Sequence, residues 1–375
     1  MAEEVTRAEV ALRRSRFRGC LLGGAVGDAL GAPVEFSSLA EIRRVYGERG
    51  LTDYAPAYGR LGAFTDDTQM TLFTADGLVR AVNRFEERGV SSPPDVVRLA
   101  YLRWFATQNE APPPGSPRGW LDGLPELHAR RAPGATCLAA LAAGGRGTPE
   151  APANSSKGCG GVRRVAPAGL VARDSFRLGC ELAALTHGHP SGYLAAGFFA
   201  RLVESLARGD DLRAAIGAAR AELARAAGHE ECSSAVERAL SAAARLPASP
   251  ESVESLGGGW VAEEAVAIAL FAALKASGFR DGVLLAVNHG GDSDSTGSMA
   301  GTLLGLVHGV EVIPPEWLAR LELRDAIERV ADDLAYASDQ PRPTREPGRD
   351  RRAARRRCEA RRYARGSSSP SEARR

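Results

Sequence analysis

Apolar residues recur at three- and four-residue spacing along most of the chain, and this helical period constrains the fold more than any other feature. The segments that show it are rich in Ala and Leu, which favour helix, and no run alternates with the period of two that is typical of a strand. Pro and Gly separate these segments. We therefore predict an all-α fold, with its clearest helices at residues 72–85, 176–185, 194–207, 212–227, 263–274 and 280–288.

The domain organisation follows from charge and composition. No repeat of fixed period occurs, and no linker interrupts the chain before residue 340, so we predict one compact helical domain over residues 1–340. Residues 341–375 carry thirteen Arg against four Asp or Glu and almost nothing apolar, which predicts a disordered tail. This tail is a solvated appendage or a weak polyanion-binding arm. The remaining 35 basic and 42 acidic residues give no clustered basic face, so we expect no nucleic-acid partner.

The chain also lacks signals for export or membrane insertion. Its first residues mix acids and bases without the apolar stretch of a signal peptide. The longest apolar run, 265–274, is far shorter than the roughly 20 residues that span a bilayer. The six cysteines are scattered without a C-x-x-C pair, which argues against zinc and against a disulfide framework. We expect a cytoplasmic monomer with reduced thiols and no membrane partner.

The first candidate for chemistry is the segment 62–70 (GAFTDDTQM), which precedes an apolar helical stretch. Asp66 and Asp67 follow Thr65 there. Thr and Asp are good N-caps, and acids favour the positive end of a helix. This segment alone therefore fits helix capping as well as it fits metal binding.

A second acidic turn, 289–297 (HGGDSDSTG), also opens an apolar stretch. Asp292, Asp294 and Ser295 place two carboxylates and a hydroxyl on one short turn, after glycines that let the backbone bend tightly. The other ligands of an EF-hand are missing, and so is the G-K-[ST] of a phosphate loop. Capping remains an alternative, although one cap needs one side chain rather than three.

The two turns together indicate more than either does alone. Four carboxylates that converge from distant segments repel one another unless a cation lies between them. Oxygen ligands without His or Cys suit Mg²⁺ or Mn²⁺ rather than zinc, with Ca²⁺ as a further option. Four acids exceed what a single Mg²⁺ usually recruits, so we predict two metal ions about 3.5–4 Å apart.

The chain resembles the ADP-ribosylglycohydrolases over most of residues 17–335. Six segments carry the resemblance, in the order in which that family has them. They are 19–36 (GCLLGGAVGDALGAPVEF), 64–68 (FTDDT), 157–167 (KGCGGVRRVAP), 185–190 (LTHGHP), 256–260 (LGGGW) and 290–295 (GGDSDS).

The resemblance implies a single orthogonal helical domain with a binuclear Mg²⁺ or Mn²⁺ centre that hydrolyses an ADP-ribose glycosidic bond. Glu35 would reach this centre from a mobile loop. Many relatives have Thr where this chain has Ser295, and because a hydroxyl is kept we expect the metal site to survive. The implied metal ligands are Thr65, Asp66, Asp67, Asp292, Asp294 and Ser295.

The resemblance also implies a substrate site. Gly158, Gly160 and Gly161 would let backbone N–H groups approach the diphosphate of ADP-ribose. Arg164 and His187 would lie near the phosphate and ribose. The family commonly has Met at position 163, so Arg164 is the better candidate for a shared role, and one of the two arginines could instead pair with an acid of the fold. Trp260 would either line the adenine side of the substrate site or have a structural role.

The glycine run at positions 19, 23, 24, 27 and 31 has two interpretations. In the first, small residues at this spacing allow two helices to pack closely. In the second, the segment contributes to the functional site of the family that the chain resembles. Only Glu35, and Asp28 if it is not purely structural, could do chemistry in this segment.

The predicted reaction is metal-assisted hydrolysis through an oxocarbenium-like state, with an acid at the centre as base. Asp292 or Asp294 is the preferred base, and Glu35 could instead act as base or relay a proton. The substrate would be an ADP-ribosylated protein or a small ADP-ribosyl conjugate. The alternatives are a binuclear-metal phosphoesterase or pyrophosphohydrolase, and a non-catalytic ADP-ribose-binding relative.

Overall fold

Helices account for the regular structure of the protein in a computed structural model. The structure describes residues 2–108, 119–172 and 174–339. Within these ranges no strand forms, and the only bridges are isolated ones, Ala57 with Arg60 and Gly158 with Val261. The all-α prediction is confirmed. The predicted tail, residues 341–375, lies outside the described residues.

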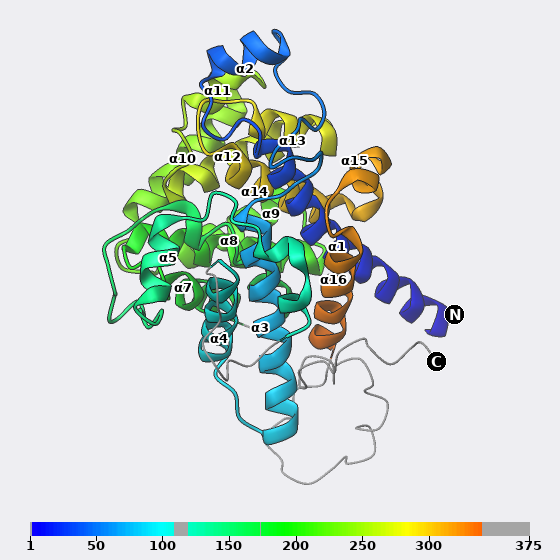
Figure 1. Cartoon of the computed structure of the whole chain (residues 1–375), viewed down its shortest axis with the longest axis vertical. Helices are drawn as coiled ribbons and strands as arrows, with labels where there is room; N and C mark the ends of the chain where they lie inside the picture. Colours follow the sequence, from blue (N-terminus) through cyan, green and yellow to red (C-terminus); the bar gives the residue numbers. More distant parts are fainter. Residues whose placement is uncertain (1, 109–118, 173, 340–375) are drawn as a thin grey trace.

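Sixteen α-helices and four short 3₁₀ helices follow one another in the described part of the chain (Figure 1). The first half contains α1 (Ala2–Gly31), α2 (Leu39–Tyr46), α3 (Asp66–Arg88), α4 (Pro93–Thr107), η1 (Leu121–Gly123), η2 (Pro125–His128), α5 (Ala135–Ala142), η3 (Cys159–Gly161), α6 (Ala166–Val171) and α7 (Ser175–Ala184). The second half contains α8 (Pro190–Arg208), α9 (Leu212–Leu223), α10 (Glu230–Arg245), α11 (Pro250–Glu254), α12 (Ala262–Lys275), α13 (Phe279–Val287), α14 (Ser293–His308), η4 (Val310–Val312), α15 (Pro315–Arg320) and α16 (Arg324–Asp339).

Each of the six predicted helices coincides with an observed one, namely α3, α7, α8, α9, α12 and α13. The largest difference at a boundary is in α3, which begins at Asp66 rather than at residue 72, so the first acidic turn is helical. The sequence analysis did not identify α1, the longest helix, because its glycines weaken the helical signal. One continuous cluster of buried apolar side chains extends from Phe17 to Ala337.

Glycines make the contact between α1 and α14 unusually close. These helices lie against each other (Figure 1), and an added Cβ at Gly27 would lie 1.9 Å from the carbonyl oxygen of Gly297. A Cβ at Gly23 would lie 2.4 Å from the carbonyl oxygen of Gly301. The glycine run therefore allows two helices to pack closely, which was the first of its two interpretations.

Asp28, a residue of α1, links this helix to the start of α3. Its carboxylate is fully buried and accepts hydrogen bonds from the backbone N–H groups of Thr65 (2.8 Å) and Thr68 (2.9 Å) and from the Thr68 hydroxyl (2.6 Å). The first turn of α3 is thereby held against α1. Asp28 has the structural role that the sequence analysis left open.

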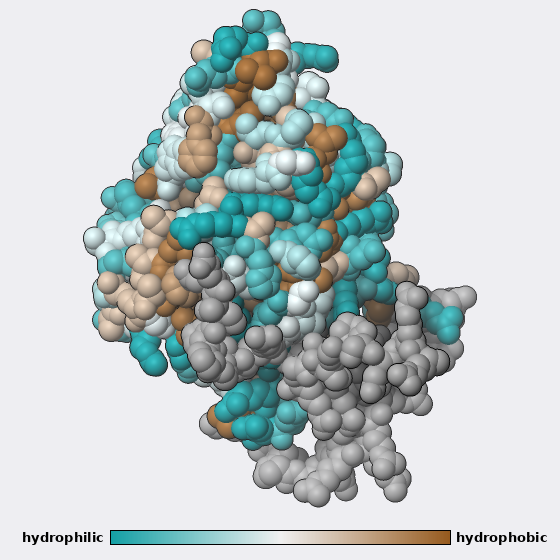
Figure 2. Space-filling view, viewed as in Figure 1, coloured by the Kyte–Doolittle hydropathy of each residue, from teal (hydrophilic) through white to brown (hydrophobic). Residues whose placement is uncertain are grey.

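The surface is mainly polar on the face shown in Figure 2, where apolar side chains form only small scattered patches. Among the described residues, no helix combines the length and the hydropathy that crossing a membrane requires.

We predict that Gly27→Ala destabilises the fold by about 1–3 kcal/mol, because the new methyl group would overlap the α14 backbone and force the two helices apart. Gly217→Ala is the matched control, since Gly217 lies within α9 and a Cβ there meets nothing within 4 Å. It should stabilise the chain by about 0.5–1 kcal/mol. Urea unfolding measures both changes, and a Gly27→Ala chain as stable as the wild type would contradict the close contact.

Candidate metal centre

The start of α3 is capped by groups other than its two acids. Thr65 is the N-cap, and its hydroxyl accepts from the Asp67 N–H at 3.3 Å, while Asp28 binds the neighbouring N–H groups. Asp66 accepts a backbone N–H from outside the helix, that of Gly134 at 3.3 Å, and Asp67 is not used as a cap. Both acids are fully buried. Helix capping therefore does not account for the Asp67 side chain, which favours the alternative that this segment binds a metal ion.

The second acidic turn opens α14. Asp292 occupies the N-cap position but makes no side-chain capping bond, and its N–H donates to the Gly258 carbonyl at 2.8 Å. Thr296 bonds within the fold, to the carbonyls of Ala286 and Asp292, each at 2.9 Å. The hydroxyl of Ser295 instead faces Arg163 Nη1 at 3.4 Å. Of these two hydroxyl residues, Ser295 is the one available to the centre.

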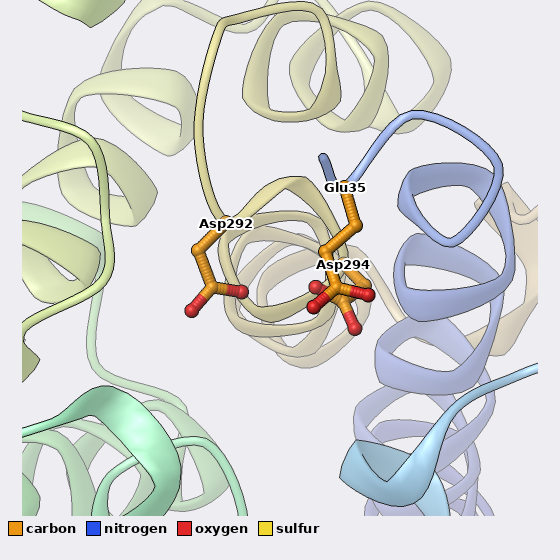
Figure 3. Close-up of side chains that lie close together, drawn as sticks. All are labelled: Glu35, Asp292 and Asp294. Carbon is orange, nitrogen blue, oxygen red and sulfur yellow. The ribbon is translucent and has the colours of Figure 1, made fainter. Parts of the chain in front are cut away.

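Glu35, Asp292 and Asp294 converge from two segments distant in sequence. One carboxylate oxygen of each lies within 4.8 Å of those of the others, and all three side chains are buried (Figure 3). Glu35 comes from the turn that follows α1, where an added Cβ at Gly31 would lie 2.4 Å from the Asp294 Cα. The helix contact that holds α1 against α14 thus also places Glu35 beside Asp294.

Burial and mutual repulsion raise the pKa values of Glu35, Asp292, Asp66 and Asp67. Burial, followed by the charges of Asp294 and Asp292, raises the pKa of Glu35 to about 10. Burial and the charge of Asp294 raise the pKa of Asp292 to about 8. Burial also raises the pKa of Asp66 to about 6 and that of Asp67 well above its usual range, although Arg163 lowers both. The charged form of this cluster therefore needs a cation.

Several carboxylate oxygens in this cluster are buried without a hydrogen-bond partner. They are Glu35 Oε2, Asp66 Oδ1, Asp67 Oδ2, Asp292 Oδ1 and Asp294 Oδ2. Unpaired buried polar atoms are costly and need an explanation. Hard oxygen donors of this kind fit Mg²⁺ or Mn²⁺. The residues present therefore suit a divalent cation.

Two neighbours of the centre were not assigned to it from the sequence. Arg163 forms ion pairs with both Asp66 and Asp67, and Cys159 donates its thiol hydrogen to Asp292 Oδ2 at 2.7 Å. Burial raises the pKa of the Cys159 thiol well above its usual range, so it stays protonated. The only signal for Arg163 was the alternative that one of two adjacent arginines pairs with an acid.

The predicted substrate loop lies next to the centre. Gly160 and Gly161 are buried in η3, and Gly158 precedes them. The His187 ring packs under this loop, where a Cβ at Gly160 would lie 3.0 Å from Cε1. Burial, followed by the charges of Arg164 and Arg163, lowers the pKa of His187 well below its usual range, so the imidazole is neutral.

Arg164 supports this loop from below. It is fully buried, donates to the Gly160 carbonyl at 2.7 Å and to the Thr186 hydroxyl at 2.5 Å, and lies over the Tyr101 ring. From this position its guanidinium shapes the loop backbone, and any contribution to ligand binding acts through that backbone.

Exposed aromatic rings border the centre. Phe36, which follows Glu35, stacks on Trp260 with ring centroids 5.8 Å apart. The carbonyl oxygen of Trp260 accepts a hydrogen bond from the backbone N–H of Cys159 at 3.0 Å. The stack therefore joins the Glu35 turn to the loop before α12. Tyr58 is 44% exposed, and burial of the rest of its side chain, followed by the Glu35 and Asp294 charges, raises its pKa.

We predict that the metal-free chain loses stability as pH rises from about 6 to about 9. The folded acids have pKa values above those of the unfolded chain, so the folded state binds more protons and unfolding becomes easier as pH rises. A divalent ion binds the deprotonated carboxylates, so Mg²⁺ should raise Tm more at about pH 8.5 than at about pH 6. Thermal unfolding with EDTA or Mg²⁺ at each pH checks this, and an equal Mg²⁺ effect at the two pH values would contradict it.

Comparison with known proteins assigns the chain to a family. The family model described as ADP-ribosylglycohydrolase matches residues 9–344. The chain is 27% identical to the ADP-ribosyl-[dinitrogen reductase] glycohydrolase of Rhodospirillum rubrum, over 82% of this chain and 91% of that protein. It is 25% identical to the ADP-ribosylarginine hydrolase Tri1 of Pseudomonas putida (strain GB-1), over 85% of this chain and 77% of that protein.

A solved structure gives the same result. It is described as an ADP-ribosylglycohydrolase-related protein complex, and the chain superposes on it with a TM-score of 0.63 at 27% identity, over 87% of this chain and 99% of that one. The family match covers most of the chain and includes every segment that forms the acidic cluster. The chain belongs to the ADP-ribosylglycohydrolase family.

Proposed function

We propose that the protein is a metal-dependent hydrolase that cleaves the glycosidic bond between ADP-ribose and a protein side chain or a small conjugate. The observation that carries the proposal is the buried cluster of Glu35, Asp292 and Asp294, together with the unpaired carboxylate oxygens of these acids and of Asp66 and Asp67. Membership in the family supports an ADP-ribosyl substrate. The name of the Pseudomonas putida relative, an ADP-ribosylarginine hydrolase, makes an arginine conjugate the first substrate to test.

The metal ligands that we propose are Thr65, Asp66, Asp67, Asp292, Asp294 and Ser295. Glu35 would be a further carboxylate ligand. The sequence predicts that this set binds two Mg²⁺ or Mn²⁺ ions. A bound divalent ion supplies Lewis-acid polarisation and a point of attachment for ligand oxygens. All of the proposed donors are oxygen atoms, and such a ligand set suits Mg²⁺ or Mn²⁺.

The chain's own groups then account for the chemistry. Cleavage of a glycosidic bond develops positive charge on the sugar, and the surrounding carboxylates stabilise it. We propose Asp292 or Asp294 as the base that accepts a proton from water. Glu35 is the alternative to these two acids, either as the base or as the group that relays a proton to the leaving group.

Substrate alignment is proposed for the loop next to this cluster. We propose that backbone N–H groups of Gly158, Gly160 and Gly161 hold the diphosphate. The neutral His187 ring packs against these glycines, and Arg164 holds the Gly160 carbonyl. Binding of the distant diphosphate would hold the reactive carbon at the acids. A monomer in the cytoplasm stays a prediction.

We predict that the purified chain releases ADP-ribose from an ADP-ribosylarginine peptide, that EDTA abolishes this release, and that Mg²⁺ or Mn²⁺ restores it. Asp292→Asn should lower kcat/KM by about 100-fold or more, because it removes a carboxylate of the centre. Asp210→Asn, the same substitution at an exposed position, is the control and should retain activity.

Chromatography of the products distinguishes the alternatives. Release of AMP from ADP-ribose, with no ADP-ribose freed from the conjugate, would identify a pyrophosphohydrolase instead. Tight binding of ADP-ribose without turnover of any conjugate in a panel of arginine, serine and small-molecule derivatives would identify a binding protein.

A further inference from the structure

The five acids of the centre fall into two groups according to their partners. Asp66 and Asp67 are paired with the Arg163 guanidinium, which bonds to one oxygen of each. Glu35, Asp292 and Asp294 have no ion pair with an arginine or lysine among the described contacts, and their oxygens form the close cluster of Figure 3. Asp66 and Asp67 thus have a direct ion pair within the chain, whereas the other three acids have none among the described contacts.

Arg163 contacts three residues of the proposed ligand set. Its Nη1 reaches Asp67 and lies 3.4 Å from the Ser295 hydroxyl, and its Nη2 reaches Asp66. These three residues are half of the proposed ligand set, and they come from both acidic turns. The guanidinium therefore bridges α3 and α14 through the same oxygen groups that an ion would use.

The surroundings keep Arg163 in this position. Its side chain is only 6% exposed, so it has no solvated alternative close by. Breaking the pairs would leave a buried guanidinium and two buried carboxylates without partners, which is strongly destabilising. An arginine also stays charged at any pH at which the protein is folded. A second divalent ion at Asp66 and Asp67 would have to displace this charge or bind directly beside it.

We infer that the Arg163 guanidinium takes the place of one of the two metal ions, so that the centre binds a single divalent ion at Glu35, Asp292 and Asp294. This inference deepens the proposed function and rests on it for the presence of a metal. It replaces the sequence prediction of two ions with one ion and one fixed positive charge. A guanidinium can neutralise the acids and donate hydrogen bonds, but it offers no open coordination position for a ligand oxygen.

The test is a count of bound Mn²⁺ by equilibrium dialysis of the metal-free chain, together with electron paramagnetic resonance of the bound ion. We expect about one Mn²⁺ per wild-type chain, with the spectrum of an isolated ion. Arg163→Met removes the charge and keeps a side chain of similar length. It should bind about two Mn²⁺ ions per chain, with the broadened spectrum of ions only about 4 Å apart.

Two further variants serve as controls. Arg103→Met removes another buried arginine, which is paired with Asp76 and Asp122 away from the centre, and should still bind one ion. Arg163→Lys keeps the positive charge and should also bind one ion, which separates the effect of charge from that of side-chain shape. If Arg163→Met does not fold, a count of two ions in the wild-type chain still overturns the inference.

The outcomes separate this inference from the proposed function. Two ions in the wild-type chain, or one ion in a folded Arg163→Met chain, would overturn the role of Arg163 and leave hydrolysis standing. A wild-type chain that binds no Mn²⁺ would overturn both. The count needs no substrate, so a failure to hydrolyse ADP-ribosyl conjugates would contradict the proposed function alone.

Discussion

The close contact of α1 with α14 is the constraint on which the rest of the structure depends. Glycines on both helices let the two backbones approach within the space that a Cβ would fill. At one end of this contact, Gly31 lies against Ser293 and Asp294, and the chain turns there to place Glu35. Asp28, three residues before Gly31, holds the start of α3. One helix contact therefore brings together the three segments that carry the acids.

The centre is costly for the fold that supports it. A buried charge without a partner costs roughly several kcal/mol, and five acids lie within one small region. The chain offsets part of this cost with Arg163 and with protons on the acids of raised pKa. The glycine contact and the large apolar core must stabilise what remains. Such a concentration of unfavourable groups is expected at a functional site rather than at a structural one.

The helices and the two acidic turns could be predicted because both depend on local sequence. Apolar spacing identified six helices, and the pattern of acids and hydroxyls around Asp67 and Asp292 identified the turns. Helix α1 could not be found in this way, because glycine disfavours a helix. The glycines of α1 stabilise the fold only through their close contact with α14. The partners of each acid were equally hidden, since Asp28 and Arg163 act across long sequence separations that no local pattern records.

Arg163 and Arg164 show the limit most clearly, because they are adjacent and identical in type. Successive residues near a helical turn point in directions about 100° apart, so one side chain enters the acidic centre while the next passes under the glycine loop. Composition and spacing cannot assign these directions. Yet the assignment decides whether the second pair of acids faces an ion or a guanidinium. The number of metal ions in this centre is therefore a property of packing around η3, and the acidic turns alone do not determine it.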